Sequence, residues 1–158
     1  MTAPTPQYVI DSCSITAMRR IYPKDVFPGA WSKLSELAET GTLISSEQVL
    51  EELKVQDDMV LLWAKAHHGI FLPLYENIQV EASKILQAFP DNLLDLKKRR
   101  SGADPFLIAT AKVNSCTVVT EENPSGGPPK VKIPDVCRAM RIECIAVLEM
   151  LRREGLKL

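Results

Sequence analysis

The chain has 158 residues, of which 46% are hydrophobic and 25% are charged. This length and composition fit one domain with a buried core and exclude both two full domains and a disordered chain. The net charge of −1 excludes nucleic-acid binding through overall positive charge, although it leaves room for a local basic or metal-assisted site. We predict a single domain over residues 1–158, with residues 1–6 as a loose tail.

Neither a membrane span nor an export signal is expected. No apolar run approaches the ~20 residues that a spanning helix needs, and the first residues lack the pattern of a signal peptide. The four cysteines (Cys13, Cys116, Cys137 and Cys144) contain no C-x-x-C pair. Reduced, buried thiols in a cytoplasmic protein are therefore expected.

The first part of the chain predicts two strands and two helices. A strand over residues 7–10 is followed by Asp11 and a helix over residues 12–20, and a proline-containing loop covers residues 22–29. Apolar residues at helical spacing predict a helix that ends at Gly41. A strand over 42–44 comes next.

The middle of the chain continues this alternation. Ser45 with Gln48 three residues later predicts a capping box that begins the next helix. A helix over 59–67, a strand over 69–72 and a helix over 76–88 follow.

The last part begins with a helix over 104–113 that is apolar on almost every side, which predicts burial. Strands over 116–120 and 143–147 enclose a loop and a helix over 133–140, and a last helix ends the pattern. Alternating strands and helices predict an α/β protein, a three-layer α/β/α sandwich with a central parallel sheet of four to five strands.

Acidic residues gather where ligands bind in such sheets, beyond the carboxyl ends of the strands. Asp11 follows the first strand and Glu121-Glu122 follow the 116–120 strand, while Asp104 begins the apolar helix. At about 100° per residue, Glu51 points away from the apolar face of its helix and Glu52 flanks that face. Carboxylates in one place favour a divalent cation such as Mg²⁺ or Mn²⁺, which could activate water for phosphodiester hydrolysis.

Each acid also has a structural interpretation. Asp104 before Pro105 is typical of a helix N-cap. Glu52 fits an ordinary surface position, and Glu121-Glu122 fit an ordinary turn.

Four segments appear in an order that resembles a known family: Tyr8–Ser12, Val49–Leu53, Ala103–Ala109 and Val118–Glu122. They are similar to the PIN-domain nucleases, which include VapC-type toxins of type II toxin–antitoxin pairs. Within PIN-like proteins, the Lys132–Cys137 segment resembles the DUF4411 group.

The resemblance implies an Mg²⁺- or Mn²⁺-dependent endoribonuclease. It implies that Asp11, Asp104 and Glu122 bind metal and that Glu52 completes the catalytic set, with Ser12 positioning the substrate. Two departures are a glutamate at 122, where aspartate is commoner, and Cys13 in place of a small polar residue. Glu121 remains an alternative to Glu122.

The basic run before Asp104 could hold the RNA backbone, through Lys98, Arg99 and Arg100. An exposed charged loop explains the same run equally well. Expected partners are RNA, a cognate antitoxin and a second copy of the chain.

Other functions remain open alternatives. A non-catalytic PIN-like interaction module fits the two departures. A receiver-type phosphoacceptor is disfavoured because Ile10 precedes Asp11 and no lysine ends the 116–120 strand.

Overall fold

The computed structural model describes residues 5–55, 58–89, 104–124 and 132–157. In these ranges the strands are β1 (Tyr8–Ile10), β2 (Leu43–Ser46), β3 (Phe71–Leu72), β4 (Thr117–Val119) and β5 (Cys144–Ile145). They form one five-stranded sheet in the order β3-β2-β1-β4-β5, and every neighbouring pair is parallel. From the central strand β1, the strands β2 and β3 follow on one side of the sheet, and β4 and β5 follow on the other. The direction in which successive strands are added therefore reverses between β1 and β4.

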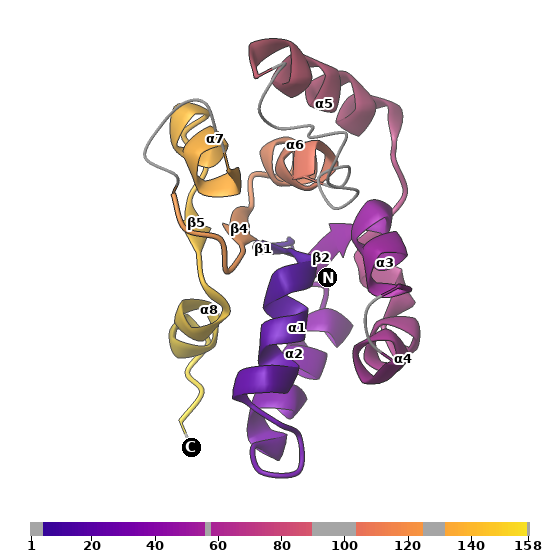
Figure 1. Cartoon of the computed structure of the whole chain (residues 1–158), viewed down its shortest axis with the longest axis vertical. Helices are drawn as coiled ribbons and strands as arrows, with labels where there is room; N and C mark the ends of the chain where they lie inside the picture. The colour runs from indigo at the N-terminus through magenta and orange to yellow at the C-terminus, as the bar shows by residue number, and fades with distance from the viewer. Residues whose placement is uncertain (1–4, 56–57, 90–103, 125–131, 158) are drawn as a thin grey trace.

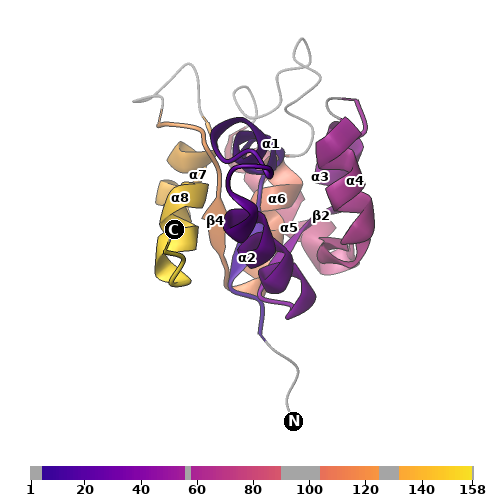
Figure 2. The same cartoon turned by 90° about the horizontal axis from the view of Figure 1, so that it is seen from below.

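The helices of the described ranges cover both faces of this sheet. They are α1 (Ser12–Ile21), α2 (Pro28–Glu39), α3 (Glu47–Leu53), α4 (Asp58–Ala66), the short 3₁₀ helix η1 (His68–Ile70), α5 (Glu76–Ala88), α6 (Asp104–Asn114), α7 (Ile133–Ala139) and α8 (Val147–Arg153). One face carries α6, with α5 packed on it and α7 beside it, whereas α1, α2 and α8 lie on the opposite face (Figures 1 and 2). The predicted three-layer α/β/α sandwich with a parallel sheet is confirmed.

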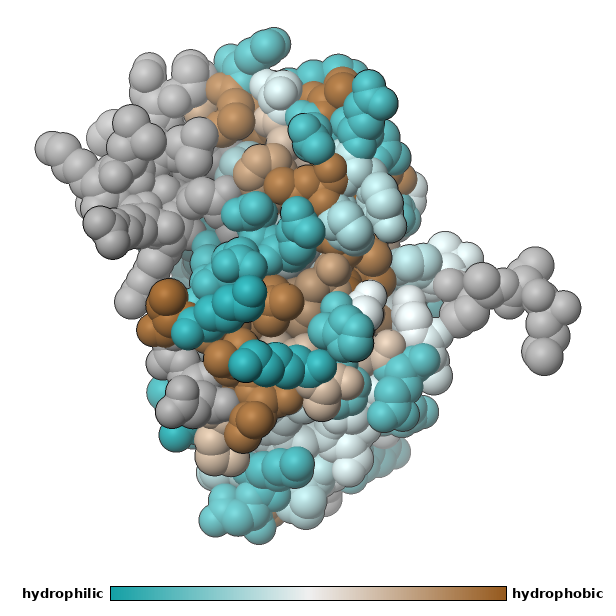
Figure 3. Space-filling model, turned by 90° about the vertical axis from the view of Figure 1, so that its right-hand side faces the viewer, coloured by the Kyte–Doolittle hydropathy of each residue, from teal (hydrophilic) through white to brown (hydrophobic). Residues whose placement is uncertain are grey.

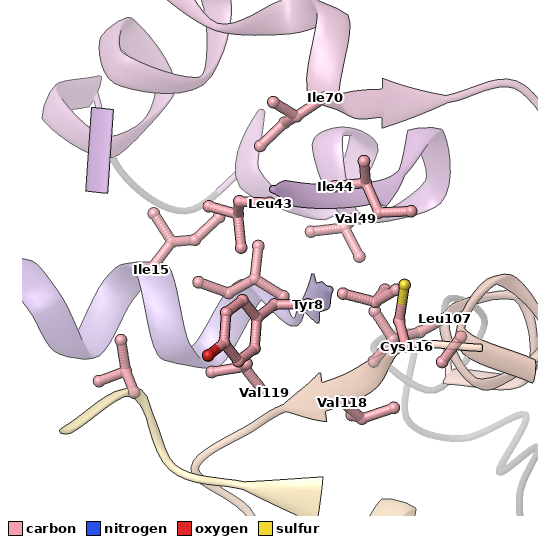
Figure 4. Packing of buried hydrophobic residues seen from close by; sticks show 14 of the residues in the cluster. Tyr8, Ile15, Leu43, Ile44, Val49, Ile70, Leu107, Cys116, Val118 and Val119 are labelled. Atoms are coloured by element: carbon pink, nitrogen blue, oxygen red, sulfur yellow. The ribbon is translucent and has the colours of Figure 1, made fainter. Parts of the chain in front are cut away.

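The core lies between these layers, and strand residues that are buried on both faces hold it together. Val9, Ile10, Val118 and Val119 are fully buried, as expected for parallel strands covered by helices. Figure 4 shows Tyr8, Leu43 and Val119 among the packed side chains of this region. The buried stretch Leu107–Ala109 of α6 confirms the expectation from its all-round apolar sequence.

The predicted cap at Ser45 is wrong by one residue. Strand β2 continues through Ser46, and the hydroxyl of Ser46 accepts the N–H of Gln48 at the start of α3. Ser45 instead donates a 2.6 Å hydrogen bond to the carbonyl oxygen of Ile10. Both serines can cap a helix, and the alternation of side chains along β2 decides which one faces α3.

The side of the molecule that carries α3, α4 and α5 mixes hydrophilic and apolar surface (Figure 3). Its most exposed apolar side chains are Val55, Met59 and Leu62, with 84%, 56% and 67% of their surface accessible. None of the helices that the structure describes combines the length and apolarity needed to cross a membrane.

Candidate functional site

Asp11 stands at the point where the strand order reverses. Its backbone N–H donates to the carbonyl oxygen of Val119, so the carboxyl ends of β1 and β4 meet here. Its side chain caps α1 by accepting the N–H of Ser12 at 2.8 Å, and its second oxygen accepts the hydroxyl of Thr120 at 2.9 Å. Only 4% of Asp11 is exposed. A buried carboxylate with two fixed donors is held in one orientation.

Cys13 supplies a further contact to the same carboxylate. Its sulfur lies 3.0 Å from Oδ2 of Asp11 and 3.3 Å from Oγ1 of Thr120, and it accepts the N–H of Glu121. Burial, with the charge of Asp11, raises the pKa of the Cys13 thiol well above its usual value. Cys13 therefore remains a neutral S–H donor, and its contact with Asp11 replaces that of a small polar residue.

Ser12 connects two acids that are distant in sequence. Its hydroxyl donates a 2.7 Å hydrogen bond to Oε2 of Glu52, on α3, and lies 3.5 Å from Oδ1 of Asp11. Glu51 is exposed and pairs with Lys54 at 2.8 Å. The helical periodicity thus predicted correctly which of the two glutamates faces inward.

Asp104, the first residue of α6, faces the other acids across the end of the sheet. Burial raises the pKa of Asp104 to about 9, and the negative charges of Asp11, Glu122 and Glu52 add to this effect. At neutral pH and without a cation, the carboxyl group of Asp104 therefore carries a proton. Because three negative charges act on the carboxyl group of Asp104, the four residues lie close together. We call them the acidic cluster: Asp11, Glu52, Asp104 and Glu122.

The two adjacent glutamates after β4 bind different helices. Oε2 of Glu122 accepts the N–H of Ile133 at the start of α7, whereas Oε1 of Glu121 accepts the N–H of Val147 at the start of α8. Burial raises the pKa of both carboxyl groups, and the charge of Asp11 acts on both. Of these two glutamates, only Glu122 contributes its charge to the raised pKa of Asp104. Glu122, and not Glu121, therefore belongs to the acidic cluster.

Thr120 is a site residue that the sequence did not single out. It is buried just beyond β4, and its hydroxyl contacts Asp11 and accepts the N–H of Glu122. Its signals in the sequence were a hydroxyl residue at the end of a strand, directly before the two glutamates, and its place in the Val118–Glu122 segment that carries the family resemblance.

The predicted RNA-contacting residues Lys98, Arg99 and Arg100 lie outside the described residues. Other cations lie near the acids. The positive charge of Lys132 lowers the pKa of Glu122, and that of Arg20 lowers the pKa of Glu121, in each case against the larger effect of burial.

The donor set of the acidic cluster fits a hard divalent cation. Mg²⁺ and Mn²⁺ prefer carboxylate oxygens and usually take only one or two of them, with water and substrate phosphate completing the shell. In the described ranges, no three His, Cys, Asp or Glu side chains already form a group that could hold a metal ion. A cation would offset the repulsion that keeps Asp104 protonated, and Asp11, Asp104 and Glu122 are the residues that would hold it.

Fold and site together define a parallel α/β protein with a partly buried acidic cluster at the switch point of its sheet. The chain belongs to the DUF4411 family, a domain of unknown function, whose family model matches residues 8–158. No curated protein matches the chain.

Proposed function

We propose that the protein is a metal-dependent endoribonuclease of the PIN type, which hydrolyses phosphodiester bonds of RNA. The observation that carries the proposal is the acidic cluster itself, in which three carboxylates act on the half-buried carboxyl group of Asp104. A protein gains no stability from gathering repelling acids at a strand end, so the cluster is best explained by a bound cation.

The chain's own residues divide the work in this proposal. Asp11, Asp104 and Glu122 hold the cation, while Ser12, Thr120 and Cys13 fix the orientation of Asp11 through the contacts described above. A divalent cation supplies Lewis-acid polarisation of the phosphate and lowers the pKa of water. Glu52 orients the attacking water, and its own position is set by the hydroxyl of Ser12.

The biological setting that we propose is the toxin of a type II toxin–antitoxin pair, acting in the cytoplasm. The support is the resemblance of the segments around Asp11, Glu52, Asp104 and Glu122 to VapC-type toxins. A cognate antitoxin would place an Arg or Lys side chain against the acidic cluster. The positive charge of that side chain can take the place of the metal ion. A homodimer is part of the same proposal.

The decisive experiment uses the purified chain with single-stranded RNA and either Mg²⁺ or Mn²⁺. Cleavage should require the metal and should be lost in Asp11→Asn and in Asp104→Asn. Asp25→Asn is the matched control, because Asp25 is exposed in the loop before α2 and should retain full cleavage. Unchanged cleavage in either cluster variant would contradict the proposal.

The second candidate is a non-catalytic PIN-like interaction module. The observation that favours it is that Oε2 of Glu122 already accepts the N–H of Ile133, so this oxygen has a structural role. A module without a metal site should show no saturable stabilisation by Mn²⁺ and no cleavage of RNA in any metal.

A further inference from the structure

Two thiols meet where helix α7 joins the edge of the sheet. Cys137 is completely buried on α7, and Cys144 is partly exposed on β5, the edge strand next to β4. Both cysteines are free thiols. The acidic cluster makes no use of either, so their proximity calls for its own explanation.

The backbone brings the two residues together. Helix α7 ends in a turn in which Arg141 has a left-handed conformation, with φ of 60°, and the N–H of Ile142 donates a 2.8 Å hydrogen bond to the carbonyl oxygen of Cys137. The chain then returns as β5, where Cys144 is in register with Val118 of β4. This tight reversal packs β5 against α7 and places Cys144 beside that helix. Hydrogen bonding between the thiols of Cys137 and Cys144 shifts the pKa of each.

The contact makes the two sulfur atoms chemically different. Acceptance of the hydrogen bond from Cys137 lowers the pKa of the Cys144 thiol, in spite of burial and the charges of Glu122 and Asp11, which act in the opposite direction. The same contact, with burial, raises the pKa of Cys137. Cys144 is thus the more nucleophilic and the more accessible of the two, and Cys137 is the buried partner behind it.

We propose that Cys137 and Cys144 are a redox modification site, which hydroperoxides convert to an intrachain disulfide. The sulfur of Cys144 attacks one oxygen of the peroxide, the O–O bond breaks, and hydroxide leaves with the thiol proton as water. The sulfur of Cys137 then attacks the resulting sulfenic acid, the S–O bond breaks, and a second water leaves with the proton of Cys137. Two thiols are oxidised by two electrons, and one hydrogen peroxide is reduced to two waters.

The bond would tie α7 to the edge of the sheet. The first N–H of α7 holds Glu122, so the disulfide connects this edge to a helix that supports the acidic cluster. The modification itself is independent of any catalytic activity and can be tested without an RNA substrate.

The test treats the purified full chain with hydrogen peroxide, alkylates the remaining thiols and maps the products by mass spectrometry after trypsin digestion. Trypsin cuts after Lys132, Arg138, Arg141 and Arg152, so Cys137 and Cys144 fall on separate peptides that stay joined only by a disulfide. The expected result is loss of two thiols per chain and appearance of the peptide pair 133–138 and 142–152, both reversed by dithiothreitol.

Cys13 and Cys116 serve as internal controls, because the thiol of Cys13 contacts Asp11 and Thr120 and that of Cys116 donates to the carbonyl oxygen of Asn114. Both should still react fully with the alkylating reagent after the peroxide treatment. In Cys144→Ser, Cys137 should keep its thiol under the same treatment. Oxidation of Cys144 to a sulfinic acid in the wild-type chain, with Cys137 still a free thiol, would overturn the proposal. A bond to Cys13, to Cys116 or between two chains overturns it equally.

Discussion

The hydroxyl of Ser12 lies 2.7 Å from Oε2 of Glu52, a residue forty positions further along the chain. The backbone N–H of Ser12 binds Asp11 at the same time. One small residue therefore sets the relative positions of two acids, one at the end of β1 and the other on α3.

Ser12→Ala removes the donor to Glu52 and leaves the N–H that binds Asp11. We expect the rate of RNA cleavage to fall about 10- to 100-fold, as is usual when a residue that orients a site acid is lost, with little change in KM. Steady-state kinetics on a defined RNA measure both constants. Ser14→Ala is the matched control on the same helix, because the buried hydroxyl of Ser14 has no hydrogen-bond partner among the described residues. Equal rates in the two variants would contradict the assigned contact.

Asp104→Asn should stabilise the fold in a manner that depends on pH. The pKa of Asp104 is about 9 in the folded chain and about 3.9 in an unfolded one. Between these values the folded state holds a proton that the unfolded state has lost, so this residue makes the folded state less stable as pH rises from 4 to 9. The penalty is absent below pH 4 and complete above pH 9.

Urea unfolding measures this effect as the difference in free energy of unfolding between wild type and Asp104→Asn. A pKa difference is worth about 1.4 kcal/mol per unit, so the variant should gain up to about 5 kcal/mol at pH 8 and progressively less toward pH 5. The exposed control Asp25→Asn should show no such trend. A constant difference between pH 5 and pH 9 would show that the Asp104 carboxyl group is not perturbed in the folded chain.

The two glutamates after β4 should separate stability from activity. Glu121→Ala removes the acceptor at the start of α8 and should cost about 0.5–2 kcal/mol, as for loss of a helix cap, with cleavage retained. Glu122→Gln keeps an oxygen for the N–H of Ile133 but removes a charge from the acidic cluster, so cleavage should fall at least about 100-fold in a stable protein. Thermal unfolding and cleavage assays on both variants measure this. The reverse pattern would make Glu121 the fourth acid.

Mn²⁺ should stabilise the wild-type chain saturably, and EDTA should reverse the effect. At 100 times its dissociation constant the ion should add about 2.7 kcal/mol to the free energy of unfolding. Binding competes with the proton on Asp104, so the affinity should rise with pH up to about 9, the pKa of Asp104. Titration calorimetry at pH 6 and pH 8 measures this trend, and Asp11→Asn should abolish the heat of binding.

The fold could be predicted because strand and helix signals are local. The run Tyr8–Ile10 followed by Asp11 indicates a buried strand and a polar edge, and a rotation of 100° per residue separates Glu52 from Glu51. These patterns need no knowledge of distant partners. They were enough to identify the sheet and the acids at its carboxyl edge.

The contacts across the site could not be predicted in this way. The choice between Ser45 and Ser46 as the cap depends on the exact end of β2, and neighbouring residues with the same chemistry leave that end undefined. The partner of Thr120 is Asp11, 109 residues earlier, and sequence spacing contains no signal for such a pair. The distinct roles of Glu121 and Glu122 likewise depend on where α7 and α8 dock.

The bonds from Glu121 and Glu122 also set an order for the completion of the site. All four acids of the cluster have been synthesised once residue 122 is in the chain, yet the amides that hold the two glutamates follow 11 and 26 residues later. A ribosome-bound chain therefore carries every carboxylate before it carries the groups that fix their positions. Catalytic competence would then arise late in synthesis, after the last two helices have docked on the sheet.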